Sequence, residues 1–250
     1  MKHLPLAIGL AAMTMAAPVP ALATDIIEMT DGERAAFRAE VRAYILENPE
    51  IIMEAVAVLE QRQAAEQSNN DQAMVLSNHD AIFNDGVSHI SGNPDGDITI
   101  VEFSDYRCAY CKRARPEVEA LVKSDGNIRL IYKEFPILGP DSLTTAKFAL
   151  ATLLEAPQSY ENMNKSLMAL RGQPSPEALR KLALGMGLDA DALLAKMDSS
   201  DVNQIIQANR ALGQQLQISG TPTFILDGQL VRGYVPLAGM QKLVEEARKQ

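Results

Sequence analysis

The chain has 250 residues and a formal net charge of −9, and no basic stripe runs along it. This acidic balance argues against nucleic-acid binding. The length accommodates one large domain, or a core domain with an appendage.

Residues 1–23 have the pattern of a cleaved secretory signal peptide. A positive charge at Lys2 precedes an apolar stretch, and Ala21-Leu22-Ala23 provides a small-x-small cleavage site. The alternative is a membrane anchor, which three prolines and the single flanking charge disfavour. No later apolar run approaches the roughly 20 residues that a spanning helix needs. We therefore expect an exported protein, in a compartment where disulfides form and persist.

Residues 24–72 are predicted to form an N-terminal helical segment followed by a linker. Two short helices, separated at Asn48-Pro49, carry apolar stripes at helical spacing: Phe37, Val41 and Ile45, then Ile52, Val56 and Leu59. The polar run 61–72 is predicted as a linker that is partly helical. An apolar stripe must be buried, either on the main domain or on another copy of itself. We expect other copies, and hence a homo-oligomer.

The next part of the chain is predicted to be mixed α/β. A short helix over 73–83 and a weak strand over 87–90 precede a buried, β-branched strand at 98–103. The cysteines follow that strand directly, and a helix begins with them, because apolar residues then recur at helical spacing as far as Val122. A second strand is predicted over 128–135.

Residues 142–217 are helical in pattern throughout, and we predict five short helices inserted between strands. A proline-led strand then begins within Gly220–Phe224, Asp227-Gly228 marks a hairpin, and a closing helix lies within 236–250. We therefore predict an α/β catalytic domain over 73–250 with a helical insertion at about 142–217.

The two cysteines of the chain, Cys108 and Cys111, lie where the buried strand ends and a helix begins. A helix N-terminus presents unpaired N–H groups and partial positive charge, which stabilise a thiolate. Cys108 is therefore expected to be nucleophilic at neutral pH. A zinc site is disfavoured because there is no further cysteine, and His79 and His89 lack ligand-like spacing. Two inert buried cysteines would not need this junction, so a redox-active pair is the favoured interpretation.

The order of these elements resembles the thioredoxin superfamily, and within it the DsbA-like periplasmic enzymes with a helical insertion. The matching motifs are EFSDYRCAYC, from Glu102 to Cys111, and GTPTF, from Gly220 to Phe224. The resemblance covers about residues 85–250. The N-terminal helices resemble the oligomerising segment of ScsC-like members, whose relatives are disulfide isomerases or oxidases linked to copper tolerance.

The resemblance implies a role for several residues. It makes Cys108 the attacking cysteine, Cys111 the resolving cysteine and Glu102 a buried acid for proton transfer. Pro222 matches a proline that is cis in the superfamily and faces the sulfurs. The residues implied to contact substrate are Thr221, Tyr110 and Gly220. No metal or other cofactor is expected beyond the redox-active disulfide Cys108–Cys111.

The expected function is that of a periplasmic thiol–disulfide oxidoreductase or isomerase, acting on the disulfides of unfolded or misfolded exported proteins. The expected partners are such substrates, a membrane redox partner and further copies of the chain, with a trimer favoured by resemblance. Three alternatives stay open: a monomeric DsbA-type oxidase, a Cu(I)-handling protein that uses the same thiolates, and a redox-silent chaperone or scaffold. The Ala109-Tyr110 dipeptide between the cysteines differs from the Pro-His of strongly oxidising members, so the direction of the reaction stays open as well.

Overall fold

The computed structural model describes residues 29–249, and the chain divides into two compact units, Met1–Gln61 and Arg62–Gln250. We call them the N-terminal unit and the C-terminal unit. The predicted signal peptide lies outside the described residues. Within the described part, no helix has both the length and the apolar character needed to cross a membrane.

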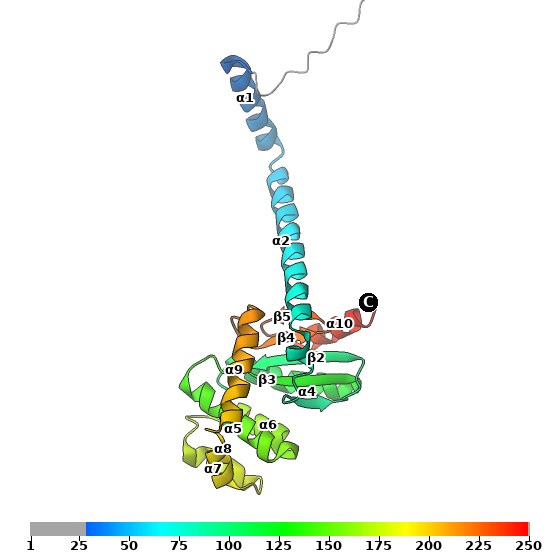
Figure 1. Cartoon of the computed structure of the whole chain (residues 1–250). Coiled ribbons are helices and arrows are strands. Elements are labelled where there is room, and N and C mark those ends of the chain that lie inside the picture. The colour runs from blue at the N-terminus through cyan, green and yellow to red at the C-terminus, as the bar shows by residue number, and fades with distance from the viewer. Residues whose placement is uncertain (1–28, 250) are drawn as a thin grey trace, which may run out of the picture. The chain divides into compact units, whose positions relative to one another are not determined.

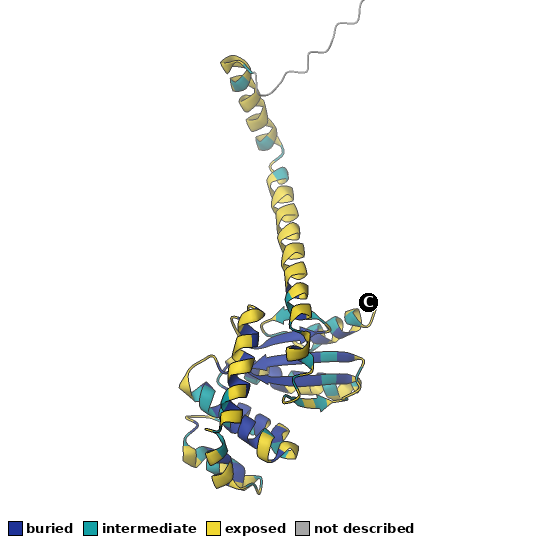
Figure 2. Ribbon diagram, viewed as in Figure 1, coloured by how far each residue is buried: buried dark blue, intermediate teal, exposed yellow. Residues whose placement is uncertain are grey.

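The N-terminal unit holds helix α1, Asp31–Glu47, and the beginning of α2, Glu50–Ser77. Thr30 starts α1 through a capping box, in which its hydroxyl accepts from the Glu33 backbone N–H and its own N–H donates to the Glu33 carboxylate. Asn48, predicted to start the second helix, caps the end of α1 instead, because its side-chain amide donates to the Tyr44 carbonyl at 2.9 Å. No residue of α1 is buried (Figure 2).

The C-terminal unit is built on a five-stranded sheet in the order β1-β3-β2-β4-β5 (Figure 1). The β2–β3 pair is parallel, and the other three pairs are antiparallel. The strands are β1 His89–Gly92, β2 Ile98–Ser104, β3 Ile128–Glu134, β4 Thr223–Leu226 and β5 Gln229–Arg232. The central strands are buried on both faces, which is why β2 and β3 read as nearly continuous apolar runs (Figure 2).

Two hydrophobic clusters cover the two faces of the sheet. One contains Ile98 and Ile100 of β2 together with side chains of α4, Ala109–Asp125, and α10, Leu237–Ala247. The other contains Val101 and Phe103 together with side chains of α3, His79–Phe83, of α9, Ser200–Gln215, and of the end of α2. Side chains alternate between the faces of a strand, so Glu102 lies on the α4 face.

The helical insertion between β3 and β4 has five α-helices, as predicted. They are α5 Pro140–Glu155, α6 Tyr160–Ala169, α7 Pro176–Gly185, α8 Ala190–Lys196 and α9 Ser200–Gln215, with one 3-10 turn, η2 Pro157–Ser159. Ser175 caps α7 by accepting from the Ala178 N–H, and Pro176 occupies the first turn. The thioredoxin fold with a helical insertion and an N-terminal helical segment is therefore confirmed.

Two local features differ from the sequence expectation. The single short helix predicted over 73–83 is divided at Asn78, whose side chain donates to the Met74 carbonyl at 2.8 Å and ends α2. A separate helix, α3 His79–Phe83, follows. The predicted linker 61–72 is helical throughout, and near its end Asp71 accepts both terminal nitrogens of Arg232, at 2.6 and 2.9 Å. This bidentate pair attaches the end of α2 to β5.

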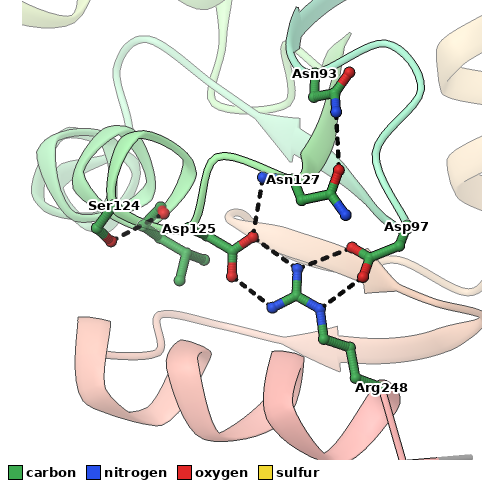
Figure 3. A network of polar contacts seen from close by, with 7 residues as sticks. Asn93, Asp97, Ser124, Asp125, Asn127 and Arg248 are labelled. Carbon is green, nitrogen blue, oxygen red and sulfur yellow. Dashed lines mark hydrogen bonds and ion pairs between the residues drawn. The ribbon is translucent and has the colours of Figure 1, made fainter.

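The C-terminal end of the chain is fixed by Arg248, which follows α10 (Figure 3). Its guanidinium donates to the carboxylates of Asp97, in the turn before β2, and Asp125, at the end of α4, over 2.7–2.9 Å. These hydrogen bonds hold the pKa of both carboxyl groups below the ordinary range. One side chain therefore joins three elements at the end of α4 that is remote from the cysteines.

Candidate functional site

Both cysteines are free thiols at the start of α4. Cys108 is the N-cap residue, and its sulfur accepts from the Cys111 backbone N–H at 3.4 Å. The sulfur therefore takes the place of the side-chain oxygen that usually satisfies this position. Cys108 is 7% exposed and Cys111 is fully buried, so only the first cysteine can meet an outside molecule.

A buried aspartate orients the loop that leads to Cys108. One oxygen of Asp105 accepts from the Arg107 N–H at 2.8 Å, and the other accepts from the backbone of Ile137 and Leu138, at 2.8 and 3.1 Å. Asp105 thereby joins the loop after β2 to the loop after β3. Sequence reasoning missed this residue, because two of its three partners, Ile137 and Leu138, lie more than thirty positions further along the chain.

The loop before β4 meets the cysteines from the other side. The Thr221–Pro222 peptide bond is cis, and the Cys108 thiol donates to the Thr221 carbonyl at 3.2 Å. Gly220 is exposed, Thr221 is half-buried and Pro222 is buried. Segments 113 positions apart thus form one site, as the paired sequence motifs predicted.

Tyr110 lies on the surface of the same site. It is 59% exposed, and its ring stacks on Tyr234 with centroids 6.3 Å apart. The guanidinium of Arg113 lies 4.5 Å from the centre of the Tyr234 ring. This aromatic pair therefore includes an exposed ring two residues after Cys108.

Glu102 is fully buried on the α4 face of β2, and neither carboxylate oxygen has a hydrogen-bond partner among the described residues. Burial raises its pKa to about 7, while the charge of Arg115 acts in the opposite direction. Close to neutral pH this carboxyl can therefore either accept or donate a proton.

Cys111 shares this buried layer. Burial raises the pKa of its thiol well above the ordinary value, and the charges of Cys108 and Glu102 raise it further. Cys111 therefore holds its proton at neutral pH until a neighbouring base accepts it. Glu102 is a carboxylate close enough to interact with the Cys111 charge.

A second buried acid, Glu134 at the end of β3, was not foreseen from the sequence. One of its oxygens accepts from the hydroxyls of Tyr106 and Tyr160, each at 2.6 Å. Burial raises its pKa to about 8 despite these two hydrogen bonds, which lower it. The alternation of Ile128, Leu130 and Tyr132 along β3 continues to Glu134 and could have located it.

Within residues 29–249, no group of three or more His, Cys, Asp or Glu side chains is arranged to hold a metal ion. The chemistry that this arrangement supports is that of two thiols and a buried acid.

Comparison with protein families gives two matches. The family model for the DSBA-like thioredoxin domain matches residues 99–245, which include both cysteines and the cis proline. The chain belongs to the DSBA-like thioredoxin domain family. A second family model, the Copper resistance protein ScsC N-terminal domain, matches residues 33–66. The two matches correspond to the two parts of the chain that resembled DsbA-like and ScsC-like proteins.

The chain is also similar to solved structures of thioredoxin-like proteins and to part of a curated antiporter. A thioredoxin-like oxidoreductase from Silicibacter pomeroyi DSS-3 is 40% identical, with a TM-score of 0.64, and the match covers 68% of this chain and 98% of that one. Proteus mirabilis ScsC in a transitional conformation is 27% identical, also with a TM-score of 0.64, over 88% of this chain and 97% of that one. A curated Na(+)/H(+) antiporter, NhaA 1 of Salinispora arenicola, is 27% identical over 64% of this chain, which spans only 24% of the antiporter.

The DsbA-like assignment gives the site its general chemistry. Members of this family are thiol–disulfide oxidoreductases, and both cysteines of this chain lie at the start of α4, within the matched residues. The direction of the reaction and the substrates belong to the proposal below.

Proposed function

We propose that the chain is a periplasmic disulfide isomerase that can also act as an oxidoreductase on exported proteins. One observation carries the proposal: Cys108 caps α4 beside the Thr221 carbonyl, above a fully buried Cys111 and Glu102. This arrangement supports one accessible nucleophile, one protected resolving thiol and one buried proton acceptor.

The first step uses Cys108. Its thiolate attacks one sulfur of a substrate disulfide, the substrate S–S bond breaks, and the other substrate sulfur leaves as a thiolate. The product is a mixed disulfide between Cys108 and the substrate. The backbone at Thr221 pairs with an extended substrate strand, and the exposed Tyr110 and Gly220 border it.

The mixed disulfide has two fates. In isomerisation, another thiolate of the substrate attacks the mixed disulfide and Cys108 leaves, so the substrate gains a different disulfide. In net reduction, Cys111 gives its proton to the Glu102 carboxylate and attacks the Cys108 sulfur. The substrate then leaves as a thiolate, and the Cys108–Cys111 disulfide remains. Oxidation of a dithiol substrate is the reverse sequence.

Two assays run side by side test this function. Reduced protein is expected to reactivate scrambled ribonuclease and to catalyse the reduction of insulin. Cys108→Ser is expected to abolish both activities. Insulin reduction without reactivation of ribonuclease would favour the monomeric DsbA-type oxidase, and tight binding of Cu(I) by a protein inactive in both assays would favour the copper-handling alternative.

We infer that the N-terminal unit forms the interface between copies of the chain, most simply in a trimer. The apolar stripe is exposed along α1 and the start of α2: Phe37, Val41, Ile52, Val56 and Leu59 are exposed, and Ile45 is half-buried. Burial of each such side chain stabilises the protein by roughly 1.5–3 kcal/mol. The whole stripe is therefore too large an apolar surface to leave in water. Several Cys108 sites joined in one oligomer raise the local concentration of thiols around one misfolded substrate.

Light scattering tests this oligomer in two ways. Val41→Glu combined with Val56→Glu is expected to give a monomer, whereas Ala43→Glu, on the opposite side of α1 at 100° per residue, is expected to leave the oligomer intact. A truncated chain that starts at Arg62 retains Asp71 and Val75, which dock α2 in the C-terminal unit, and is expected to be monomeric. A monomeric parent protein would refute the idea.

The proposed location rests on residues 1–23. Export is expected to remove this leader, so the periplasmic protein should begin at Thr24. Sequencing the N-terminus of protein from a periplasmic extract tests this expectation, and an intact leader in the membrane fraction would indicate an anchor instead.

A further inference from the structure

Arg115 is a buried cation without an ion pair. It lies on α4 and is only 6% exposed. Its Nη1 donates to the Tyr132 hydroxyl at 2.7 Å, and its guanidinium carbon lies 5.2 Å from the centre of the Tyr132 ring. Its Nε has no hydrogen-bond partner, and no carboxylate within the described residues lies within 4.0 Å of it. A buried charge in this state is destabilising unless another interaction offsets it.

The position of Arg115 brings its charge to the layer of Glu102. Arg115 is four residues after Cys111, so both lie on the same face of α4. The residue that holds the guanidinium, Tyr132, is the neighbour of Glu102 in the β2–β3 register. An unpaired buried carboxyl and an unpaired buried guanidinium therefore occupy adjacent places between α4 and the sheet.

A solvent-open cleft explains how Arg115 can stay charged there. The cleft has a volume of about 550 Å3 and is lined by Arg115, Tyr132, Glu119 and Glu161, among others, but not by Glu102. Water and the two glutamates on this side offset part of the desolvation of the guanidinium. Arg115 and Tyr132 form a wall between the cleft and the buried acid.

The charges of Arg115 and Glu102 also influence each other's pKa. Burial raises the pKa of Glu102, and Arg115 is the one charged group within the described structure with a resolved influence on it, in the lowering direction. Conversely, the Glu102 charge is one of those that raise the pKa of Arg115. The other titratable groups around this layer are Cys108 and Cys111 at the start of α4, Tyr106 and Asp105 from the loop after β2, Tyr132 and Glu134 from β3, Tyr160 from α6, His89 from β1, and Glu119 and Glu161 at the cleft. None of these is a lysine or an arginine.

We propose that Arg115 is a positioning residue that lowers the proton affinity of Glu102, and thereby sets the pH range over which Cys111 gives up its proton. The second half rests on the proposed proton-transfer role of Glu102. The first half rests on the contact of Arg115 with Tyr132, on the place of Tyr132 beside Glu102, and on the coupling between the two charges.

The direct test is the titration of Glu102 itself. In the full-length reduced protein labelled with carboxyl-13C glutamate, the Glu102 signal is the one that Glu102→Gln removes. Arg115→Met and Arg115→Gln are expected to raise its midpoint by about one pH unit or more, the usual effect of an opposite charge at close range. Glutamine keeps a donor for the Tyr132 hydroxyl, so it provides a second neutral variant if methionine disturbs folding. Arg115→Lys is expected to keep most of the parental midpoint.

Arg113→Met is the matched control, because it removes the same charge from the exposed side of the same helix. It is expected to leave the midpoint of Glu102 unchanged. A parental midpoint in both neutral variants at Arg115 would overturn the inference, and so would an equal shift in the Arg113 variant.

The kinetic consequence is read from the rate at which Cys111 resolves a preformed mixed disulfide on Cys108, measured against pH. The neutral Arg115 variants are expected to move this profile by the same amount as the Glu102 midpoint, and to have no such effect in the Glu102→Gln background. A shifted Glu102 midpoint with an unmoved rate profile would support the coupling and overturn the proton-transfer role of Glu102. The coupling between Arg115 and Glu102 and the proton-transfer role of Glu102 are therefore tested by different outcomes.

Discussion

Replacing Glu102 by glutamine gives a quantitative prediction about folding stability. Burial raises the pKa of Glu102 to about 7 from its ordinary 4.5, against the opposing effect of Arg115. The folded state therefore binds this proton more tightly than the unfolded chain does. By linkage, the free energy of unfolding falls as the pH rises from 4.5, and the loss is complete above about 7. At about 1.4 kcal/mol for each tenfold change in proton affinity, the whole loss is about 3 kcal/mol.

Glutamine has nearly the same shape and no charge, so Glu102→Gln should remove this pH dependence. Urea unfolding of the reduced parent and variant at about pH 5 and about pH 8.5 measures it. The free energy of unfolding of the variant minus that of the parent is expected to be about 2–3 kcal/mol larger at the higher pH than at the lower pH. Glu134 is present in both proteins, and the Glu102 charge is the last of the causes that raise its pKa, so most of its contribution cancels in the difference.

Glu245→Gln, an exposed change on α10, is the control and is expected to reproduce the parental pH dependence. The reasoning is refuted if the difference in stability between Glu102→Gln and the parent is the same at both pH values. That result would mean that Glu102 holds its proton no more tightly in the folded state than in the unfolded chain.

Three further changes test separate parts of the structure. Gly213→Ala should destabilise the protein by about 1–2 kcal/mol, because the added methyl overlaps the buried Phe135 ring. This loss is expected although alanine favours a helix more than glycine does. In the control Gly185→Ala the added methyl meets no neighbour, and the same urea unfolding should show no loss of stability. Lys133→Met should lower the free energy of unfolding by roughly 2–3 kcal/mol and speed amide exchange in α3. The reason is that the buried Lys133 amine donates to the Ala81 carbonyl and the Asp85 carboxylate. The control Lys165→Met, at an exposed lysine, should leave stability unchanged. Cys111→Ser should accumulate a mixed disulfide on Cys108 that non-reducing gels detect, and its absence would contradict the assignment of Cys111 as the resolving thiol.

Much of the C-terminal unit could be predicted from the sequence, because its signals are local. The apolar run 98–103 and the helical periodicity after Cys111 located the strand-to-helix junction, and Asp227-Gly228 located the hairpin, with both residues at positive φ. Glu102 was placed correctly in the core, because its neighbours on both sides in the strand are large and apolar and carry it into the interior with them.

The parts that were missed depend on pairings between distant residues. The run 61–72 is polar, which favoured a linker, yet Asp71 is buried because Arg232 lies opposite it in the folded chain. Glu134 and its two tyrosines come from β3, the loop after β2 and α6. Nothing in one stretch of sequence reveals that three such elements meet.

The buried acids of this unit provide proton-binding groups near neutral pH in a chain that has no histidine between Cys108 and Cys111. Burial is the largest cause that raises the pKa of Glu102 to about 7 and that of Glu134 to about 8, so ordinary carboxyl groups reach the range where histidine usually serves. The same burial weakens the folded state whenever the acids are ionised. In our proposal Arg115 limits that weakening, because it lowers the proton affinity of the Glu102 carboxylate. The same carboxylate must still be basic enough to accept the Cys111 proton. The position of one guanidinium would thus balance stability against proton transfer.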